Sequence, residues 1–278
     1  MWQLDNGTPF AADRGWVRDR DGSEVWLVVV KATFELNGDG GLGLARQQPP
    51  VLRVPQYFGD PGASSVKYDA DLVLRKANTD IVVVGSAHAP AGQAVAEMDV
   101  GFQVGSVQKR LRVFGDRRWG SFGLGSPSPF ECMPVVYERA FGGVDAHSSN
   151  PQRDWEWRNP VGRGYAVQRR HLQASLAPNV EQVTDPIRDW DDRPAPAGFG
   201  VVAAHWQPRA SFAGTYDDHW KRSRRPLLPD DFNESFFCQF SLKVERFSLK
   251  MEPPPKLGAA ALTCRRTFTQ QGGVVWPL

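Results

Sequence analysis

Cysteine is scarce in this sequence, which contains only three in 278 residues. Cys132, Cys238 and Cys264 are far apart, odd in number and form no closely spaced pair. Disulfide-rich secreted domains and structural zinc sites both need several cysteines at short, regular intervals. The sequence therefore predicts neither disulfides nor a zinc site, and it favours a reducing compartment.

Long apolar runs and a strong charge imbalance are also lacking. No stretch approaches the roughly 20 apolar residues of a membrane-spanning helix, and the first residues contain no apolar signal-peptide core. The formal net charge is +2, which is too small to indicate a nucleic-acid partner. We therefore expect a cytoplasmic protein that binds neither a membrane nor nucleic acid.

Established catalytic motifs are missing as well. The sequence has no His-Glu-x-x-His, no Gly-x-Ser-x-Gly and no phosphate-binding P-loop. Gly38, Gly40 and Gly43 match the dinucleotide pattern GxGxxG, but Pro49 and Pro50 follow where that motif requires a helix to begin. We interpret the glycines as a hairpin turn and expect no cofactor.

Acidic side chains and one histidine late in the chain are nevertheless of the types that hydrolytic enzymes use. They are Asp217, Asp218 and His219, together with Glu181 and Asp231. Asp217 and Asp218 are adjacent rather than at metal-ligand spacing, and an Asp in such a loop more simply caps nearby backbone N–H groups. We expect no metal and no catalysis, with a hydrolase or modifying enzyme as the alternative.

Glycine, proline and tryptophan are abundant, with 27, 22 and 10 residues respectively. Glycine and proline supply turns, and tryptophan supplies large buried surfaces. Patterns typical of strands dominate the first half, and no ten-residue amphipathic helix separates them. The predicted strands are 24–36, 66–77, 80–87, 94–104, 107–114 and 130–139, with a tight turn at 105–106 and a short turn at 78–79.

These patterns predict a mainly β fold, an antiparallel sandwich-like or partly closed sheet with a long ordered loop region and little helix. We expect a single domain in three parts. A β-rich scaffold covers about 1–140, a loop-rich and partner-facing region covers about 141–232, and terminal strands follow in about 233–278. Two further strands are expected at 236–251 and 259–269. Tryptophans and phenylalanines are expected to pin the long loop region onto the sheet.

The stretch 214–232 combines aromatic residues, a basic run at 221–225 and two prolines, Pro226 and Pro229. Because proline is excluded from a helix interior, we expect an irregular loop, held in place by its apolar side chains. The basic run is most simply a solvated face, and a protein partner is the next interpretation.

Repeated turn units occur in a characteristic order, and they carry a family resemblance. They include Gly115-Asp-Arg-Arg-Trp119, Tyr137-Glu-Arg-Ala-Phe-Gly-Gly143, Asn159-Pro-Val-Gly-Arg-Gly164, Pro178-Asn-Val-Glu181 and Trp206-Gln-Pro-Arg209. Over about residues 24–237 the chain resembles a bacterial domain-of-unknown-function family encoded beside the VgrG and PAAR spike proteins of type VI secretion. Its members act as adaptors or chaperones that load effectors.

The resemblance implies a cytoplasmic, non-catalytic adaptor that binds a toxic effector and loads it onto the VgrG or PAAR spike. A structural component of the secreted spike is the alternative. The residues expected to contact a partner are Tyr216, Asp217, His219, Trp220, Lys221, Arg222, Arg224, Arg225, Leu227, Leu228 and Phe232.

A second set of residues is expected to shape the turns. It comprises Arg139, Phe141, Gly142, Gly143, Asn159, Pro160, Gly162, Gly164, Asn179, Glu181, Gly198, Phe199, Gly200, Trp206, Arg209, Gly214 and Asp231. The glycines are expected to supply positive φ or close packing. Arg139, Arg163 and Arg209 are expected to bond loop carbonyls or the carboxylates of Glu138, Glu181 and Asp231.

Overall fold

The computed structural model describes residues 3–38, 40–76 and 79–238 of the chain. The strands are β1 (Ala11–Arg18), β2 (Glu24–Lys31), β3 (Phe34–Leu36), β4 (Leu42–Leu44), β5 (Gln56–Tyr57), β6 (Val66–Tyr68), β7 (Ser86–His88), β8 (Glu97–Val104), β9 (Val107–Phe114), β10 (Trp119–Gly120), β11 (Gly123–Leu124), β12 (Cys132–Pro134), β13 (Phe141–Gly142), β14 (Arg163–Gly164) and β15 (Val180–Gln182). The α-helices are α1 (Arg169–Leu172) and α2 (Asp218–Ser223). The 3₁₀ helices are η1 (Pro90–Gly92), η2 (Tyr137–Arg139), η3 (Arg209–Phe212) and η4 (Glu234–Phe237).

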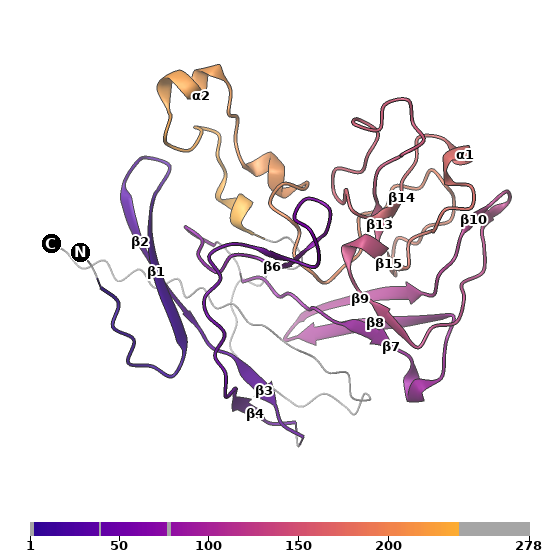
Figure 1. Cartoon of the computed structure of the whole chain (residues 1–278), viewed down its shortest axis with the longest axis horizontal. Coiled ribbons are helices and arrows are strands. Elements are labelled where there is room, and N and C mark those ends of the chain that lie inside the picture. The colour runs from indigo at the N-terminus through magenta and orange to yellow at the C-terminus, as the bar shows by residue number, and fades with distance from the viewer. Residues whose placement is uncertain (1–2, 39, 77–78, 239–278) are drawn as a thin grey trace.

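The fold is mainly β with little helix, as the sequence predicts. Within the described residues the strands form several small sheets, all antiparallel except for the parallel pair of β13 and β14, and none closes into a barrel. The largest has the order β15-β9-β8. β1 and β2 form a separate hairpin, which lies on the opposite side of the molecule from β9 and β10 (Figure 1).

Two hairpins form where local turn chemistry predicts them. β8 and β9 pair along their full length through the two-residue turn at Gly105 and Ser106, with Gly105 at φ +61°. β3 and β4 pair across the glycine-rich turn, where the Asn37 N–H donates to the Gly41 carbonyl at 2.8 Å. The turn interpretation of the GxGxxG match is therefore confirmed.

Other strand predictions are wrong because the partners of these strands lie far away in the sequence. The segments 66–77 and 80–87 do not pair with each other, since β6 pairs with β5 and β7 pairs with β12. The stretch 24–36 divides into β2 and β3, and 130–139 holds only β12 before it turns into η2. At the start of the predicted 236–251 strand the chain forms η4, while the rest of that strand and 259–269 lie outside the described residues.

The long loop region is ordered because its aromatic side chains join the main core. Trp206 is 1% exposed and its ring lies edge-on to Tyr137 at 5.7 Å between centroids. Phe199 packs edge-on against Phe102 of β8 at 5.1 Å. These contacts extend the core beneath β9, where Leu111 is fully buried. The loop region and the sheet thus share one hydrophobic core.

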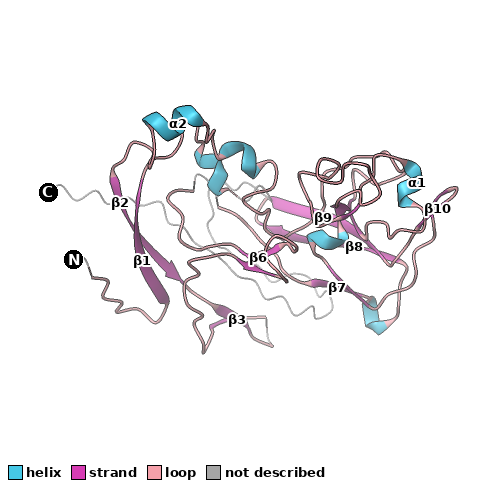
Figure 2. Cartoon of the chain, turned by 45° about the horizontal axis from the view of Figure 1, so that its top comes forward, coloured by secondary structure: helices cyan, strands magenta, loops and turns pink. Residues whose placement is uncertain are grey.

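The helix α2 stands at the margin of the molecule, away from β8, β9 and β15, in both views of the chain (Figures 1 and 2). No helix among the described residues is long and apolar enough to cross a membrane.

Candidate partner-binding site

Residues 214–232, which we call the α2 arm, contain a short helix where the sequence predicts an irregular loop. The carboxylate of Asp217 accepts the Trp220 N–H at 2.8 Å and caps the first turn of α2. The helix then ends before Pro226, so neither proline lies inside it. The prediction of a non-helical arm was wrong because a capped helix needs only the six residues that precede the prolines.

Both ends of the arm are joined at its base. The backbone N–H and the hydroxyl of Thr215 donate to the two oxygens of Asp231, at 2.8 and 2.7 Å. These bonds hold the pKa of Asp231 below its usual range. Gly214 has φ +81°, and a Cβ added there would lie 2.8 Å from Pro229. The base therefore requires glycine and fixes how the arm leaves the core.

Aromatic side chains stiffen the arm internally. The Trp220 indole N–H donates to the Leu227 carbonyl at 2.8 Å, which ties α2 to the returning chain. The ring of Tyr216 lies edge-on to Trp220 at 4.8 Å, yet Tyr216 is still 49% exposed. Tyr216 is therefore both held in place and accessible.

Arg224 attaches the arm to the β1–β2 hairpin. Its guanidinium donates to the Arg20 carbonyl at 2.6 Å and forms an ion pair with Asp230 at 3.0 Å. Leu227 also lies close to the turn of this hairpin, because a Cβ added at Gly22 would be 3.3 Å from its Cδ2. Arg224 thus acts mainly as a brace.

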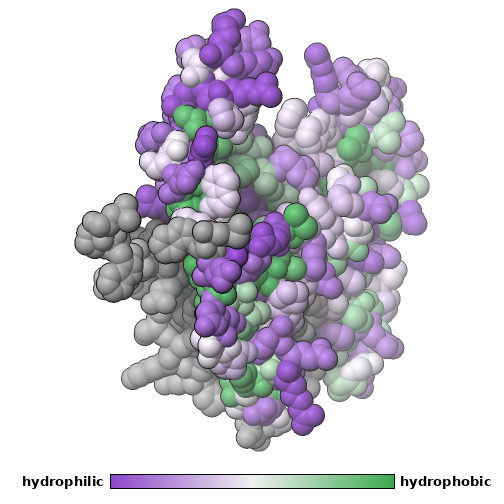
Figure 3. All heavy atoms as spheres, turned by 60° about the vertical axis from the view of Figure 1, so that its left-hand side comes forward, coloured by the Kyte–Doolittle hydropathy of each residue, from purple (hydrophilic) through white to green (hydrophobic). Residues whose placement is uncertain are grey.

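The predicted contact residues divide by exposure. Tyr216, Asp217, His219, Lys221, Arg222 and Arg225 are exposed, whereas Trp220, Arg224, Leu227 and Leu228 are half-buried. Phe232 is buried against Phe236 and Phe237, so its place is in the packing of the arm's base rather than on its surface. The upper part of the arm forms a largely hydrophilic protrusion (Figure 3).

The turn residues predicted from the sequence form a tightly packed unit around Asn159. This fully buried side chain donates to the carbonyls of Tyr137 and Phe141 at 2.7 and 2.9 Å. A Cβ at Gly162 would lie 2.4 Å from the same amide nitrogen, and Gly143 has φ +95°. Glycine is therefore required for close approach and for positive φ, as expected.

Asn179 occupies a second hub. Its side-chain oxygen accepts from Arg139 and Arg163 at 3.3 and 3.2 Å, and its nitrogen donates to the Phe114 carbonyl at 3.2 Å. Arg163 also donates to the Glu138 carbonyl at 3.0 Å, which confirms its predicted role on a loop carbonyl. This hub connects the turn units to the end of β9.

The predicted carboxylate partners are wrong, since Glu138 accepts from the Ser65 N–H and hydroxyl and Asp231 accepts from Thr215. Glu181 pairs with buried Arg117, which also donates to the Pro178 carbonyl at 3.0 and 3.2 Å. Arg209 donates to the Phe236 and Val202 carbonyls, which confirms its predicted role on loop carbonyls, but its carboxylate partner is Asp69 at 2.9 Å. Neither partner is near in the sequence. In the sequence, the only sign that Arg117 has a structural role is its position inside the Gly115–Trp119 turn unit.

The carboxylates that could suggest hydrolytic chemistry each have a separate structural hydrogen-bond partner. Asp217 caps α2 and Asp231 binds Thr215 at the base of the arm. Glu181 lies in β15, apart from α2 (Figure 1), where it accepts the Ile187 N–H at 3.1 Å. Glu181 is therefore not brought together with Asp217. Among residues 3–38, 40–76 and 79–238, no three His, Cys, Asp or Glu side chains cluster as metal ligands.

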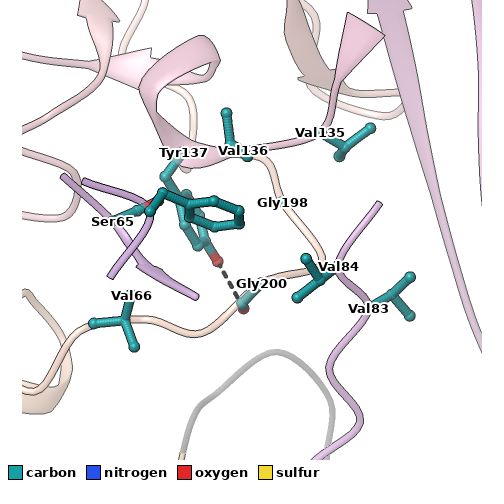
Figure 4. Close-up of a pocket in the computed structure, with 10 residues that line it drawn as sticks. Ser65, Val66, Val83, Val84, Val135, Val136, Tyr137, Gly198 and Gly200 are labelled. Carbon is teal, nitrogen blue, oxygen red and sulfur yellow. Dashed lines mark hydrogen bonds between the residues drawn. The ribbon is translucent and has the colours of Figure 1, made fainter. Parts of the chain in front are cut away.

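A small apolar pocket lies beside Tyr137 and has room for about one water molecule. Figure 4 shows the Tyr137 ring against Gly198, with its hydroxyl donating to the Gly200 carbonyl at 3.3 Å. A Cβ at Gly198 would lie 2.9 Å from this ring. Burial raises the pKa of Tyr137 well above its usual value. The pocket is thus a packing gap around a buried tyrosine.

Comparison with known proteins places the chain in a family. Neither the curated proteins nor the solved structures yield a match. A family model described as an uncharacterized protein conserved in bacteria matches residues 21–243, which include the turn units and the whole α2 arm. The chain therefore belongs to the bacterial DUF2169 family.

Proposed function

We propose that the protein is a non-catalytic adaptor of type VI secretion, which binds a toxic effector in the cytoplasm and loads it onto a VgrG or PAAR spike protein. The proposal takes its partners from the resemblance of the turn units. The α2 arm is the surface that we assign to binding.

The observation that carries this assignment is the internal bracing of an exposed segment. The Asp217 cap, the Thr215–Asp231 bonds and the Trp220–Leu227 bond hold the arm in one conformation. A surface ordered before binding loses less conformational entropy when a partner arrives. Such bracing suits a protein that must bind and then hand over its cargo.

The exposed side chains of the arm are of the kinds that dominate protein interfaces. Tyr216, Arg222 and Arg225 are accessible, and tyrosine and arginine are enriched among residues with large contributions to binding. Lys221 forms an exposed ion pair with Asp218 at 2.8 Å, which is worth little in free energy. We infer that the contacted surface of the partner is acidic.

Co-purification tests the proposal. The tagged chain is expressed in its own bacterium, and the proteins retained with it are identified by mass spectrometry. Recovery of an effector together with a VgrG or PAAR protein is expected. Recovery of neither contradicts the adaptor role. Stoichiometric presence of the chain in secreted material favours a structural part of the spike instead.

A further inference from the structure

The short hairpin of β10 and β11 presents a phenylalanine at its tip. Gly120 pairs with Gly123, so Ser121 and Phe122 form the two-residue turn between the strands. The Phe122 side chain is fully exposed, at 104%. Two-residue turns favour glycine, asparagine and aspartate for their backbone angles, so turn geometry does not account for a phenylalanine at this position. A large apolar side chain is therefore held out into solvent.

The hairpin is firmly attached to the rest of the protein. Trp119 of β10 is 4% exposed and packs in the same hydrophobic cluster as the buried side of α1. The Trp119 carbonyl accepts the Ala174 N–H at 2.8 Å, just after α1. Within the turn itself, Arg169 of α1 donates to the Ser121 carbonyl at 2.9 Å. The tip of the hairpin is therefore braced, and its exposure is not that of a loose loop.

The surroundings of the hairpin are basic. Residues 117–130, which contain it, and residues 157–180, which include α1, have no aspartate or glutamate. Arg118, Arg169 and Arg170 are all exposed. Arg118 and Arg169 each donate to a main-chain carbonyl, which is an uncharged group, so their guanidinium groups keep the full positive charge. The apolar tip thus stands among positive charges.

This surface is well separated from the α2 arm. In both views of the chain, β10 lies near one end of the longest axis and α2 lies toward the other end (Figures 1 and 2). A partner bound at one of these places therefore leaves the other place accessible. The hairpin offers a binding surface beyond the one assigned to the arm.

A pocket in a protein suits this combination of groups better than a lipid surface does. Phenylalanine and arginine are both enriched where protein interfaces are fully buried. Membrane attachment needs a larger apolar surface, since even a whole myristoyl chain gives only marginal binding. One apolar side chain on a braced tip matches a pocket of similar size.

We propose that Phe122 anchors a second protein partner by entering an apolar pocket, and that acidic side chains around this pocket pair with Arg118, Arg169 and Arg170. The basic surroundings select a partner with an acidic rim, because complementary charges favour association and like charges oppose it. The braced hairpin loses little conformational entropy when the pocket closes around its tip.

Site-specific photo-crosslinking identifies the partner. A photoreactive phenylalanine analogue replaces Phe122 in the full chain, which is expressed in its own bacterium and irradiated. The expected product joins position 122 to another protein, within a peptide that has aspartate or glutamate beside apolar residues. The control carries the analogue at Val54, another exposed apolar residue, and gives no crosslink to that peptide.

Affinity measurements with the purified partner test the two parts of the site. Phe122→Ala is expected to raise Kd at least about 30-fold, as the loss of an interface anchor does. Tm should not change, because the side chain is fully exposed. Arg170→Glu should raise Kd at least about tenfold through repulsion of the acidic rim. Val54→Ala should leave Kd unchanged.

Four outcomes would overturn the proposal. Equal affinity of folded Phe122→Ala and the wild-type chain removes the anchor, and a crosslink between two copies of the chain assigns the hairpin to self-association. Absence of any crosslink from position 122 to another protein also rejects it. Phe122-dependent binding to vesicles of phosphatidylcholine and phosphatidylglycerol assigns the tip to a membrane instead.

The double variant Arg222→Glu with Arg225→Glu separates this site from the α2 arm. We expect this variant to lose the partner of the arm and to keep the crosslink from position 122. Loss of that crosslink in the folded variant contradicts a second, independent site. Failure of the adaptor role would leave the crosslink and its dependence on Arg170 unchanged, so the two proposals fail in different ways.

Discussion

Buried polar side chains in the loop region take the place of the backbone ladders that a longer sheet would supply. Asn159 donates to the Tyr137 and Phe141 carbonyls, and Asn179 donates to the Phe114 carbonyl at the end of β9. Arg117 and Glu181 do the same as a buried pair. A buried polar group without a partner destabilises the folded state, so removal of one partner at these positions should lower the free energy of unfolding strongly.

Glu181→Ala tests this at a single residue. The change leaves the Arg117 guanidinium buried without its carboxylate, so we expect a loss of about 3–5 kcal/mol in the free energy of unfolding. Urea denaturation measures the loss. Glu131→Ala removes an exposed glutamate and should change stability by less than about 0.5 kcal/mol. Similar losses in both variants would contradict the account.

Lys109 should make the free energy of unfolding depend on pH. Its ammonium donates to the Gly198 carbonyl at 2.6 Å, and burial lowers its pKa from 10.5 to about 8. Between these values the unfolded chain is protonated at this position and the folded chain is not. The unfolding free energy should therefore rise as pH increases through this window, by at most about 1.4 kcal/mol per pH unit.

Comparison with Lys109→Met between pH 7.5 and 9.5 isolates this contribution. The wild-type chain should gain stability relative to the variant as pH increases. The raised pKa of Tyr137 opposes this only above pH 10, where the unfolded tyrosine ionises. A difference that stays constant or shrinks over this range would show that the ammonium is not desolvated.

The α2 arm is an element whose conformation is determined at its two ends. The helix has only six residues, which is too short to be stable without its cap and its tertiary contacts. Thr215, Asp231 and Gly214 fix the base, and Arg224 fixes the side that faces the β1–β2 hairpin. A substitution at the base, outside α2, should therefore change the stability of the helix.

Gly214→Ala is expected to disorder the arm. The alanine must adopt φ near +81° and its Cβ would meet Pro229, which should cost at least about 1–2 kcal/mol. Hydrogen exchange of the α2 amides should become faster, while exchange in β8 and β9 stays unchanged. Gly85→Ala, where nothing lies within 4 Å of an added Cβ, is the matched control. Unchanged α2 protection in Gly214→Ala would argue against a strained base.

The sequence predicts pairing between strands that are adjacent in the chain, and it misses contacts between segments that are far apart in the chain. Gly105-Ser106 and the glycine-rich turn after β3 predict their hairpins because the pairing strands are adjacent. No local pattern shows that β7 pairs with β12 or that Arg117 binds Glu181. For the arm, the sequence predicts the ordering aromatic residues and the Asp217 cap, but not the helix, because Pro226 and Pro229 exclude a helix only from their own part of the arm and leave room for six helical residues before them.

At the scale of the whole molecule, the sheets and the turn units form a support that holds the α2 arm at the margin. The shared core of Leu111, Phe199 and Trp206 makes the loop region part of this support. The exposed basic residues of the arm should attract an acidic partner through long-range forces. Salt screens such forces, with a Debye length of about 8 Å at physiological ionic strength.

Partner binding should accordingly weaken as salt increases from 50 to 500 mM. Titration of the recovered effector or spike protein with the adaptor, followed by calorimetry or interferometry, measures the change in Kd. We expect an increase of about tenfold or more, mostly from slower association. A Kd that is insensitive to salt would exclude the basic residues from the interface.

The most direct test of the central claim compares two charge reversals on one recovered partner. Arg222→Glu with Arg225→Glu changes two exposed residues of the α2 arm, and Arg153→Glu changes an exposed arginine outside it. We predict that the arm variant raises Kd by at least about 100-fold at unchanged Tm, corresponding to about 1.4 kcal/mol for each tenfold change. The Arg153 variant should bind as the wild-type chain does. Equal affinity of the folded arm variant and the wild-type chain would contradict the assignment of the α2 arm as the partner-binding site.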